Sequence, residues 1–184
     1  MSKDLLSSKK TFKPGDKVIY PSHGMGYISA LESHEIAGEK LSVYVIYFEQ
    51  ARMKLRLPIT KAKSSGLRGL SSSKQMEEAL RTLKTKGKVR RTMWARRAQE
   101  YELKINSGNP SAIAEVLRDL HRNATQPDQS YSERQIYQDA MARFSRELCA
   151  VEVLTEEKAI EAIQTALGHA APVIEPEQLS SVAA

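Results

Sequence analysis

The hydrophobic pattern of the chain changes its period near residue 70, and this change constrains the fold more than any other feature of the sequence. Before residue 70, short segments rich in Val, Ile, Tyr and Phe are separated by turn-forming residues, which is typical of β-strands. From Ser73 onward, apolar residues recur every three or four positions, which is typical of amphipathic helices. The sequence therefore predicts an α+β protein, with a small antiparallel β-barrel or curled sheet followed by a helical domain.

Four strands are predicted in the first half of the chain. They are expected at Lys17–Tyr20, Tyr27–Glu32, Val43–Glu49 and Arg52–Pro58. Gly24 and Gly26 supply backbone freedom, which predicts a tight reversal around Met25. We expect the barrel to span residues 12–70, after a disordered segment at residues 1–11.

The fourth predicted strand has a clear alternation of residue types. Met53, Leu55 and Leu57 share one face, so the intervening cations lie on the opposite face. These cations are Arg52, Lys54 and Arg56. Charged residues on an exposed strand deter unwanted strand pairing, and the same charges could equally bind an acidic protein surface. The residues by themselves favour neither interpretation.

Five helices are predicted in the second half, within a domain at residues 71–168. The first is expected at Ser73–Thr85, the second runs from an N-cap at Thr92 to Asn106, and the last runs from Thr155 to Gly168. The third begins with an N-cap at Asn109 followed by Pro110, and the fourth begins with a capping box of Ser132 and Gln135. The tail at residues 169–184 contains two prolines and little periodicity, so we expect it to be disordered.

Positive charge is concentrated in one segment, between Arg81 and Lys104. This segment holds nine basic and two acidic residues, a net charge of +7, whereas the whole chain carries +6. A run of like charges is often only a solvated face, but the concentration of the whole surplus favours contact with phosphates. Nucleic acid is therefore the first candidate partner.

Trp94 is the only tryptophan and lies within this basic segment. Arginines stand on both sides of it, at Arg90, Arg91, Arg96 and Arg97. On pattern alone, a lone tryptophan on a helical stripe is more often a core anchor. An aromatic residue flanked by arginines can also stack on an exposed base or insert into a widened minor groove.

Enzymatic, metal-binding and membrane functions are disfavoured by the sequence. The four histidines are scattered, without a pair at metal-ligand spacing, and no phosphate-binding loop is present. Cys149 is the only cysteine, so no intramolecular disulfide or thiolate metal cage is available within the chain. No apolar run approaches the roughly 18 residues of a transmembrane helix. We expect a cytoplasmic protein that is not an enzyme and uses no cofactor or metal.

Five segments, in order and without large gaps, match the pattern of a known family. They are FKPGDKVIYPSHGMGYISALE at Phe12–Glu32, MKLRLP at Met53–Pro58, GLR at Gly66–Arg68, WARR at Trp94–Arg97 and AEVLRDLHR at Ala114–Arg122. Over about residues 12–167, the chain strongly resembles the CarD-like (CdnL) family of bacterial transcription regulators. The resemblance implies a Tudor-like barrel that binds the RNA polymerase β subunit, and a helical domain that contacts promoter DNA.

The resemblance also implies roles for individual residues. Arg56 matches a family arginine that helps bind the β subunit, which favours docking as the role of the cations at Arg52, Lys54 and Arg56. His34 occupies a place where some relatives have an arginine that faces the polymerase. Trp94 matches a tryptophan that inserts at the upstream fork of the transcription bubble. Arg96 and Arg97 match basic residues beside it, and Gln99 replaces a cation found in some relatives.

The function expected from these observations is stabilisation of the promoter open complex, by a protein associated with the nucleoid through RNA polymerase. The expected partners are the polymerase β subunit and promoter DNA, without a small-molecule substrate or a membrane. The alternative is an autonomous, sequence-nonspecific nucleic-acid-binding protein that acts without polymerase. Retention of the polymerase β subunit by the immobilised barrel would favour the polymerase-bound regulator over the autonomous protein.

Overall fold

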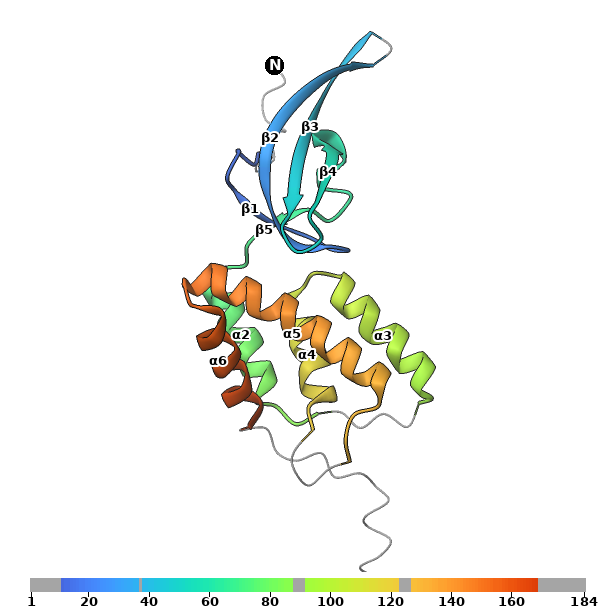
Figure 1. Ribbon diagram of the computed structural model, residues 1–184, viewed down its shortest axis with the longest axis vertical. Coiled ribbons are helices and arrows are strands. Elements are labelled where there is room, and N and C mark those ends of the chain that lie inside the picture. The colour runs from blue at the N-terminus through green and yellow to red at the C-terminus, as the bar shows by residue number, and fades with distance from the viewer. Residues whose placement is uncertain (1–10, 37, 88–91, 123–126, 169–184) are drawn as a thin grey trace, which may run out of the picture.

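In the computed structural model of the protein, the described residues are 11–36, 38–87, 92–122 and 127–168. A strongly curved sheet lies at one end and a bundle of helices lies at the other (Figure 1). All strands precede residue 70 and the long helices follow it, so the predicted α+β class is confirmed. Of the segments expected to be disordered, residues 1–10 and 169–184 lie outside the described residues.

The sheet contains five antiparallel strands within the described residues. They are β1 (Lys17–Tyr20), β2 (Gly24–Ile36), β3 (Glu39–Phe48), β4 (Met53–Pro58) and β5 (Arg68–Gly69). Their order is β4-β3-β2-β1-β5, and a register shift between Ile28 and Ala30 marks an irregularity in β2. A short helix, α1 (Ile59–Ala62), follows β4. This curved sheet fits the Tudor-like barrel that the family resemblance implies, and residues 12–70 are called the barrel below.

The curved sheet and α1 enclose an apolar core. Its buried residues are Phe12, Val18, Ile28, Tyr44, Ile46, Phe48, Leu57, Ala62 and Leu67. The hydroxyl of Tyr44 accepts a hydrogen bond from the backbone N–H of Phe12, at 3.2 Å. This bond satisfies a buried polar group and attaches the segment before β1 to the core.

The predicted reversal around Met25 is wrong. Tyr20 pairs with Gly24, so the chain reverses at residues 21–23 and both glycines lie in β2. Gly24 has a φ of +75°, which explains a glycine there. At Gly26, a Cβ atom would lie 2.7 Å from the carbonyl oxygen of Tyr47, so this glycine permits close approach of β3.

The alternation predicted for the fourth strand is confirmed, with one correction. Lys54 and Arg56 are exposed on β4, and Leu57 is buried on its other face. Arg52 lies before the strand, in a turn where its φ is +49°. The prediction placed Arg52 in the strand because the apolar–basic alternation continues through the turn without a visible break.

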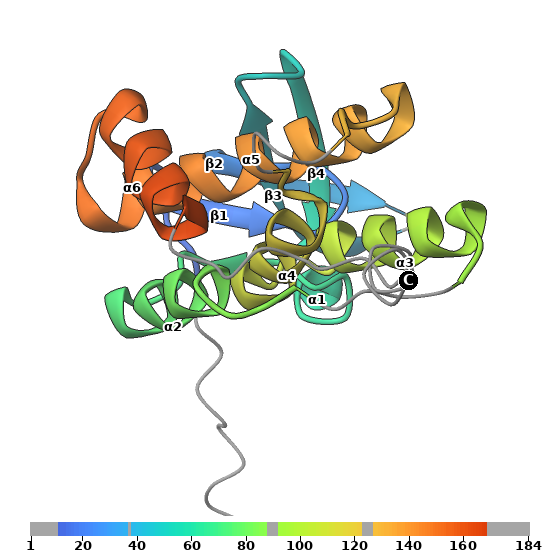
Figure 2. The same ribbon diagram turned by 90° about the horizontal axis from the view of Figure 1, so that it is seen from below.

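Five long helices make up the described part of the bundle. They are α2 (Ser73–Leu83), α3 (Trp94–Asn106), α4 (Pro110–Leu120), α5 (Tyr131–Glu152) and α6 (Glu156–Gly168). The central helix is α4, which packs against α2, α3 and α5 (Figure 2). Its sequence is apolar on several faces, with Ile113, Val116 and Leu117 all buried, as this central position requires.

The helix ends correct two predicted caps. The N-cap of α3 is Met93, without a side-chain hydrogen bond, in place of Thr92. The capping box of α5 consists of Ser130 and Glu133, in place of Ser132 and Gln135. Both pairs have the required spacing, but the Glu133 carboxylate also interacts favourably with the helix dipole. The predicted N-cap Asn109 with Pro110 at the start of α4 is confirmed.

Candidate functional sites

The outer edge of β4 is the first candidate site. Strand β4 lies at one edge of the sheet and pairs only with β3 among the described strands. Its outer backbone N–H and C=O groups can therefore accept a further strand. Lys54 and Arg56 extend from the exposed face of this edge strand, and the exposed Arg52 stands at the turn that precedes it.

Glu32 connects two of the residues predicted to form this site. Its Oε2 atom accepts hydrogen bonds from Nε of Arg56, at 3.0 Å, and from Nε2 of His34, at 2.8 Å. These bonds, chiefly that from Arg56, hold the pKa of Glu32 below its ordinary value. The structure thus brings His34 and Arg56 together, through an acidic residue that the sequence did not indicate.

The start of α3 is the second candidate site, and Trp94 is its first helical residue. The indole is partly buried and packs against the core of the bundle, with its ring centroid 6.4 Å from that of Tyr101. The guanidinium carbon of Arg97 lies 5.4 Å from the centroid of the indole, within the range of a cation–π interaction. One part of the Trp94 indole is therefore packed against the bundle core, and the indole also contacts the Arg97 guanidinium.

The basic residues around Trp94 differ in exposure. The side chain of Arg96 is 76% exposed, and its Nε lies 3.9 Å from Oε1 of Glu100. Arg97 is partly buried, and its buried Nε has no hydrogen-bond partner among the described residues. Gln99 is exposed on the same helix. Arg90 and Arg91, predicted to belong to this site, lie outside the described residues.

Two large apolar side chains are exposed in or next to α3, Met93 at its start and Leu103 more than two turns further along, and the sequence prediction did not include them. Met93, which directly precedes Trp94, is 82% exposed, and Leu103 is 71% exposed. Leu103 falls outside the apolar stripe formed by Trp94, Tyr101 and Ile105. This position on the helix could have indicated that Leu103 is exposed. Exposed apolar groups beside cations suit contact with unstacked bases.

Two family models match the chain. The CarD-like/TRCF RID domain matches residues 12–71, and the CarD C-terminal domain matches residues 78–164. The chain belongs to the CarD-like family. It is also 29% identical, over 147 residues, to the "Putative transcription factor YdeB" of Bacillus subtilis (strain 168). That match covers 80% of this chain and 96% of the relative.

The family assignment identifies the general role of this CarD-like protein. The RID domain is a type of domain that interacts with RNA polymerase, and the family consists of transcription factors rather than a class of enzymes. The β4 edge lies within the RID match, and the start of α3 lies within the C-terminal match. Each candidate site therefore falls in a different family domain.

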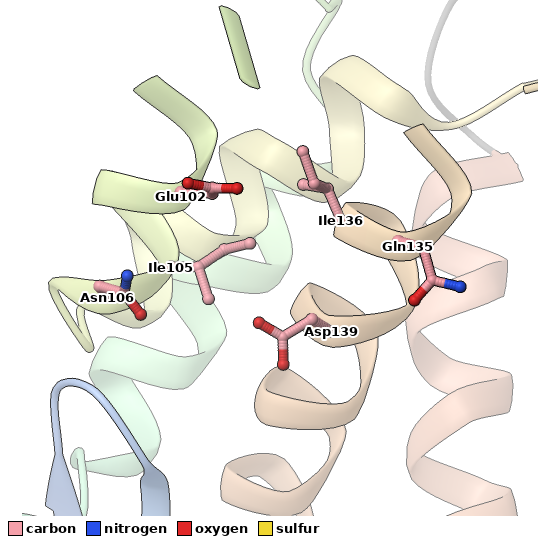
Figure 3. Close-up of a pocket in the computed structure, with 6 residues that line it drawn as sticks. All are labelled: Glu102, Ile105, Asn106, Gln135, Ile136 and Asp139. Atoms are coloured by element: carbon pink, nitrogen blue, oxygen red, sulfur yellow. The ribbon is translucent and has the colours of Figure 1, made fainter. Parts of the chain in front are cut away.

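A hollow between α3 and α5 does not have the character of a nucleic-acid site. It encloses about 210 Å³ and is lined by Glu102, Ile105, Asn106, Gln135, Ile136 and Asp139 (Figure 3). Its two carboxylates, Glu102 and Asp139, would repel phosphates. Within the described residues, no group of three or more His, Cys, Asp or Glu side chains could hold a metal ion. No described helix is long and apolar enough to cross a membrane.

Proposed function

We propose that this CarD-like protein binds the β subunit of RNA polymerase through the β4 edge and contacts promoter DNA with the start of α3. The DNA contact lies at the upstream edge of the transcription bubble and stabilises the open complex. The protein is then associated with the nucleoid through polymerase. The observation that carries the proposal is the presence of an exposed, basic strand edge on one domain and an aromatic–basic helix start on the other.

The β4 edge offers two kinds of contact with a protein. Its unpaired backbone can add a strand from the partner, and its basic side chains can bind carboxylates beside that strand. Arg56 is the best-placed of these cations. Among the described residues it donates a hydrogen bond only through Nε, to Glu32. Its two terminal amino groups are left for a bidentate contact with an acidic residue of polymerase.

The start of α3 lies far from the barrel. Gly108, just after the end of α3, lies against Ile19 and Pro21 of the barrel, whereas Trp94 is at the opposite end of the helix. Thirteen residues of helix separate the two ends by about 20 Å. The tryptophan can therefore reach DNA that runs beside the polymerase surface to which the barrel is bound.

Stabilisation of the open complex requires tighter binding to the open state than to the closed state. An aromatic residue that contacts unstacked bases or a widened minor groove supplies this difference, since regular duplex DNA does not offer the same surface. Binding of the barrel to polymerase raises the local concentration of the helical domain at the DNA. A weak electrostatic contact through residues such as Arg96 is then sufficient.

The proposed polymerase contact is tested by Arg56→Glu. This change places a second carboxylate beside Glu32 and reverses the charge at the β4 edge, so retention of the variant by the immobilised β subunit should be lost. The side chain of Arg56 is 59% exposed, so the fold should persist. Arg81→Glu, at a similarly exposed arginine on α2, is the matched control and should be retained normally. Normal retention of a folded Arg56→Glu variant would refute this interface.

The proposed effect on DNA is tested by the lifetime of promoter open complexes formed by polymerase with and without the protein. We expect a longer lifetime in its presence, and footprints that extend protection at the upstream edge of the bubble. An unchanged lifetime, or tight binding to DNA without polymerase, would instead favour the autonomous nucleic-acid-binding function.

A further inference from the structure

Helix α5 holds the barrel through two side chains that stand one helical turn apart, Arg143 and Glu147. Glu147 binds Arg68 of β5, and Arg143 binds the turn between β1 and β2. Both α5 residues face the barrel, because positions four apart lie on the same side of a helix. These contacts connect residues that are 79 and 122 positions apart in the sequence.

The Glu147 contact is a buried, bidentate ion pair. The side chain of Glu147 is 3% exposed, and its two oxygens lie 2.7 and 2.9 Å from the terminal nitrogens of Arg68. Oε1 also accepts from the backbone N–H of Ser71, at 3.0 Å, and from its hydroxyl, at 2.7 Å. Arg68 in addition donates to the carbonyl of Gly108 through Nε, at 3.1 Å, and through Nη2. One guanidinium therefore joins β5, α5 and the end of α3.

The Arg143 contact is directed at backbone carbonyls. Nη1 donates to the carbonyl of Pro21 at 2.9 Å, and Nη2 donates to the carbonyl of Ser22 at 3.2 Å. Nε donates to Oδ1 of Asp139, one turn earlier on α5, which fixes the orientation of the guanidinium. The side chain of Arg143 is only 16% exposed. The β1–β2 turn is thus held at a second point along the same helix.

Two attachment points restrict rotation as well as separation. A single contact would let the barrel pivot about it, whereas hydrogen bonds at both β5 and the β1–β2 turn oppose such a pivot. Planar guanidinium groups with several donors are directional, so the contacts specify an angle that apolar packing alone would not. Gly108, after the end of α3, lies beside Ile19 and Pro21, so a third segment of the helical domain meets the barrel at the same interface.

We propose that Arg68, Glu147 and Arg143 are positioning residues that fix the orientation of the helical domain on the barrel, and so deliver Trp94 to DNA when the barrel is bound to polymerase. This inference rests on the proposed function. The three residues touch neither partner. A loosely attached helical domain would lose orientational freedom when it binds DNA, and this loss would weaken binding. These residues fix the orientation beforehand, which keeps the effective concentration of the helical domain at the DNA high.

The orientation is tested by distance measurements between two spin labels, one on each domain. The labels are placed at Ser42→Cys on β3 and Gln164→Cys on α6, both exposed, in a Cys149→Ser background. The double variant Arg68→Lys/Arg143→Lys keeps both charges but removes the multiple directed donors. We expect a narrow distance distribution in the parent and a broad one in this variant. Arg81→Lys, in an ion pair confined to α2, is the matched control and should leave the distribution narrow.

The functional consequence is measured with the same full-length proteins. Open complexes formed with the Arg68→Lys/Arg143→Lys variant should have a lifetime extension about tenfold smaller than with the parent, because the effective concentration of the DNA-contacting helix falls. Retention by the β subunit and binding to free DNA should not change, since the candidate contact residues are intact. Glu147→Gln, which removes the charge without changing the shape, should reduce the lifetime extension in the same way and leave both binding measurements unchanged. This variant shows that the effect is not caused by the introduced lysines themselves.

Two results would overturn the inference: a distribution in the variants as narrow as in the parent, or a broad distribution with an unchanged lifetime extension. Failure of the proposed function has a different signature. In that case the parent itself would not prolong the open complex, or would not be retained by the β subunit, while the spin-label distances would still decide whether these residues fix the orientation.

Discussion

Trp94 is the residue at which the sequence allowed two opposed roles, core anchor and DNA wedge. Its partial burial against the bundle core and its contact with Arg97 show that one part of the indole is packed while another remains accessible. Packing of one side would orient the ring without removing it from solvent. Partial packing is therefore compatible with the proposed DNA contact, and the two roles can be separated by measurement.

Trp94→Ala should shorten the lifetime of open complexes while leaving β-subunit binding intact. Because the indole is only partly buried, the loss in unfolding free energy should be smaller than the about 3–5 kcal/mol typical of a fully buried aromatic residue. Arg96→Ala should also shorten the lifetime, but its effect should fade as salt is raised, since it removes an exposed charge. The checks are thermal unfolding and open-complex lifetime at two salt concentrations. An unchanged lifetime for Trp94→Ala would assign the residue to structure alone.

His121 provides a pH-dependent measure of bundle stability. It is partly buried, with Nδ1 3.4 Å from the hydroxyl of Tyr137, and burial lowers its pKa below the ordinary 6.5. The unfolded chain therefore binds a proton at this residue at higher pH than the folded chain does. The unfolding free energy should fall as the pH drops below about 6.5, until the folded pKa is also passed.

His121→Gln should flatten this acid-side decrease, because the substituted residue does not titrate. Denaturant unfolding between pH 7 and pH 5 measures it. His23→Gln, at an exposed histidine in the barrel, is the matched control and should retain the parental dependence. The same slope in His121→Gln as in the parent would mean that another group is responsible.

At the scale of single elements, local chemistry could be predicted and long-range pairing could not. The start of α4 was predictable because Asn109 and Pro110 act on the backbone next to them. Strand β5 has only two residues and is defined by pairing with β1, where Ile19 lies opposite Arg68, so no local pattern marks it. The ion pair between Arg68 and Glu147 is invisible in the sequence for the same reason. The basic and aromatic residues of the candidate sites could be predicted from the sequence. The pairing of Glu32 with Arg56 could not, because it depends on the register of β2, β3 and β4.

The start of α5 shows how two overlapping local signals are resolved. Ser130 accepts a hydrogen bond from the N–H of Glu133, and the Glu133 carboxylate accepts one from the N–H of Ser130 at 2.9 Å. Ser130→Ala should therefore cost about 1 kcal/mol of stability. Ser132→Ala, two residues later, should change stability by less than about 0.5 kcal/mol. Chemical denaturation of both variants checks the assignment, and a larger loss for Ser132→Ala would reverse it.

At the scale of the whole molecule, the two candidate sites have different electrostatic tasks. Arg56 of β4 is paired with Glu32, which balances part of the positive charge at this edge and favours a specific contact over general attraction. The basic segment from Arg81 to Lys104 contains nine cations and two acidic residues, so we expect it to attract phosphates without regard to sequence. Specificity for promoters then comes from polymerase, to which the barrel is proposed to bind.

Free DNA should consequently be bound weakly, without sequence preference and with a steep dependence on salt. If about four or five phosphates are contacted, the logarithm of the association constant should fall against the logarithm of salt concentration with a slope of about −4. Arg96→Ala should reduce the magnitude of this slope by about 1, because one phosphate contact is lost, whereas Arg56→Glu should leave it unchanged if the β4 edge takes no part in DNA binding. Titration of labelled duplexes of unrelated sequence at several salt concentrations measures these slopes. Tight binding to one duplex at near-physiological salt, or a slope that depends on Arg56, would contradict the proposed assignment of polymerase and DNA to separate domains.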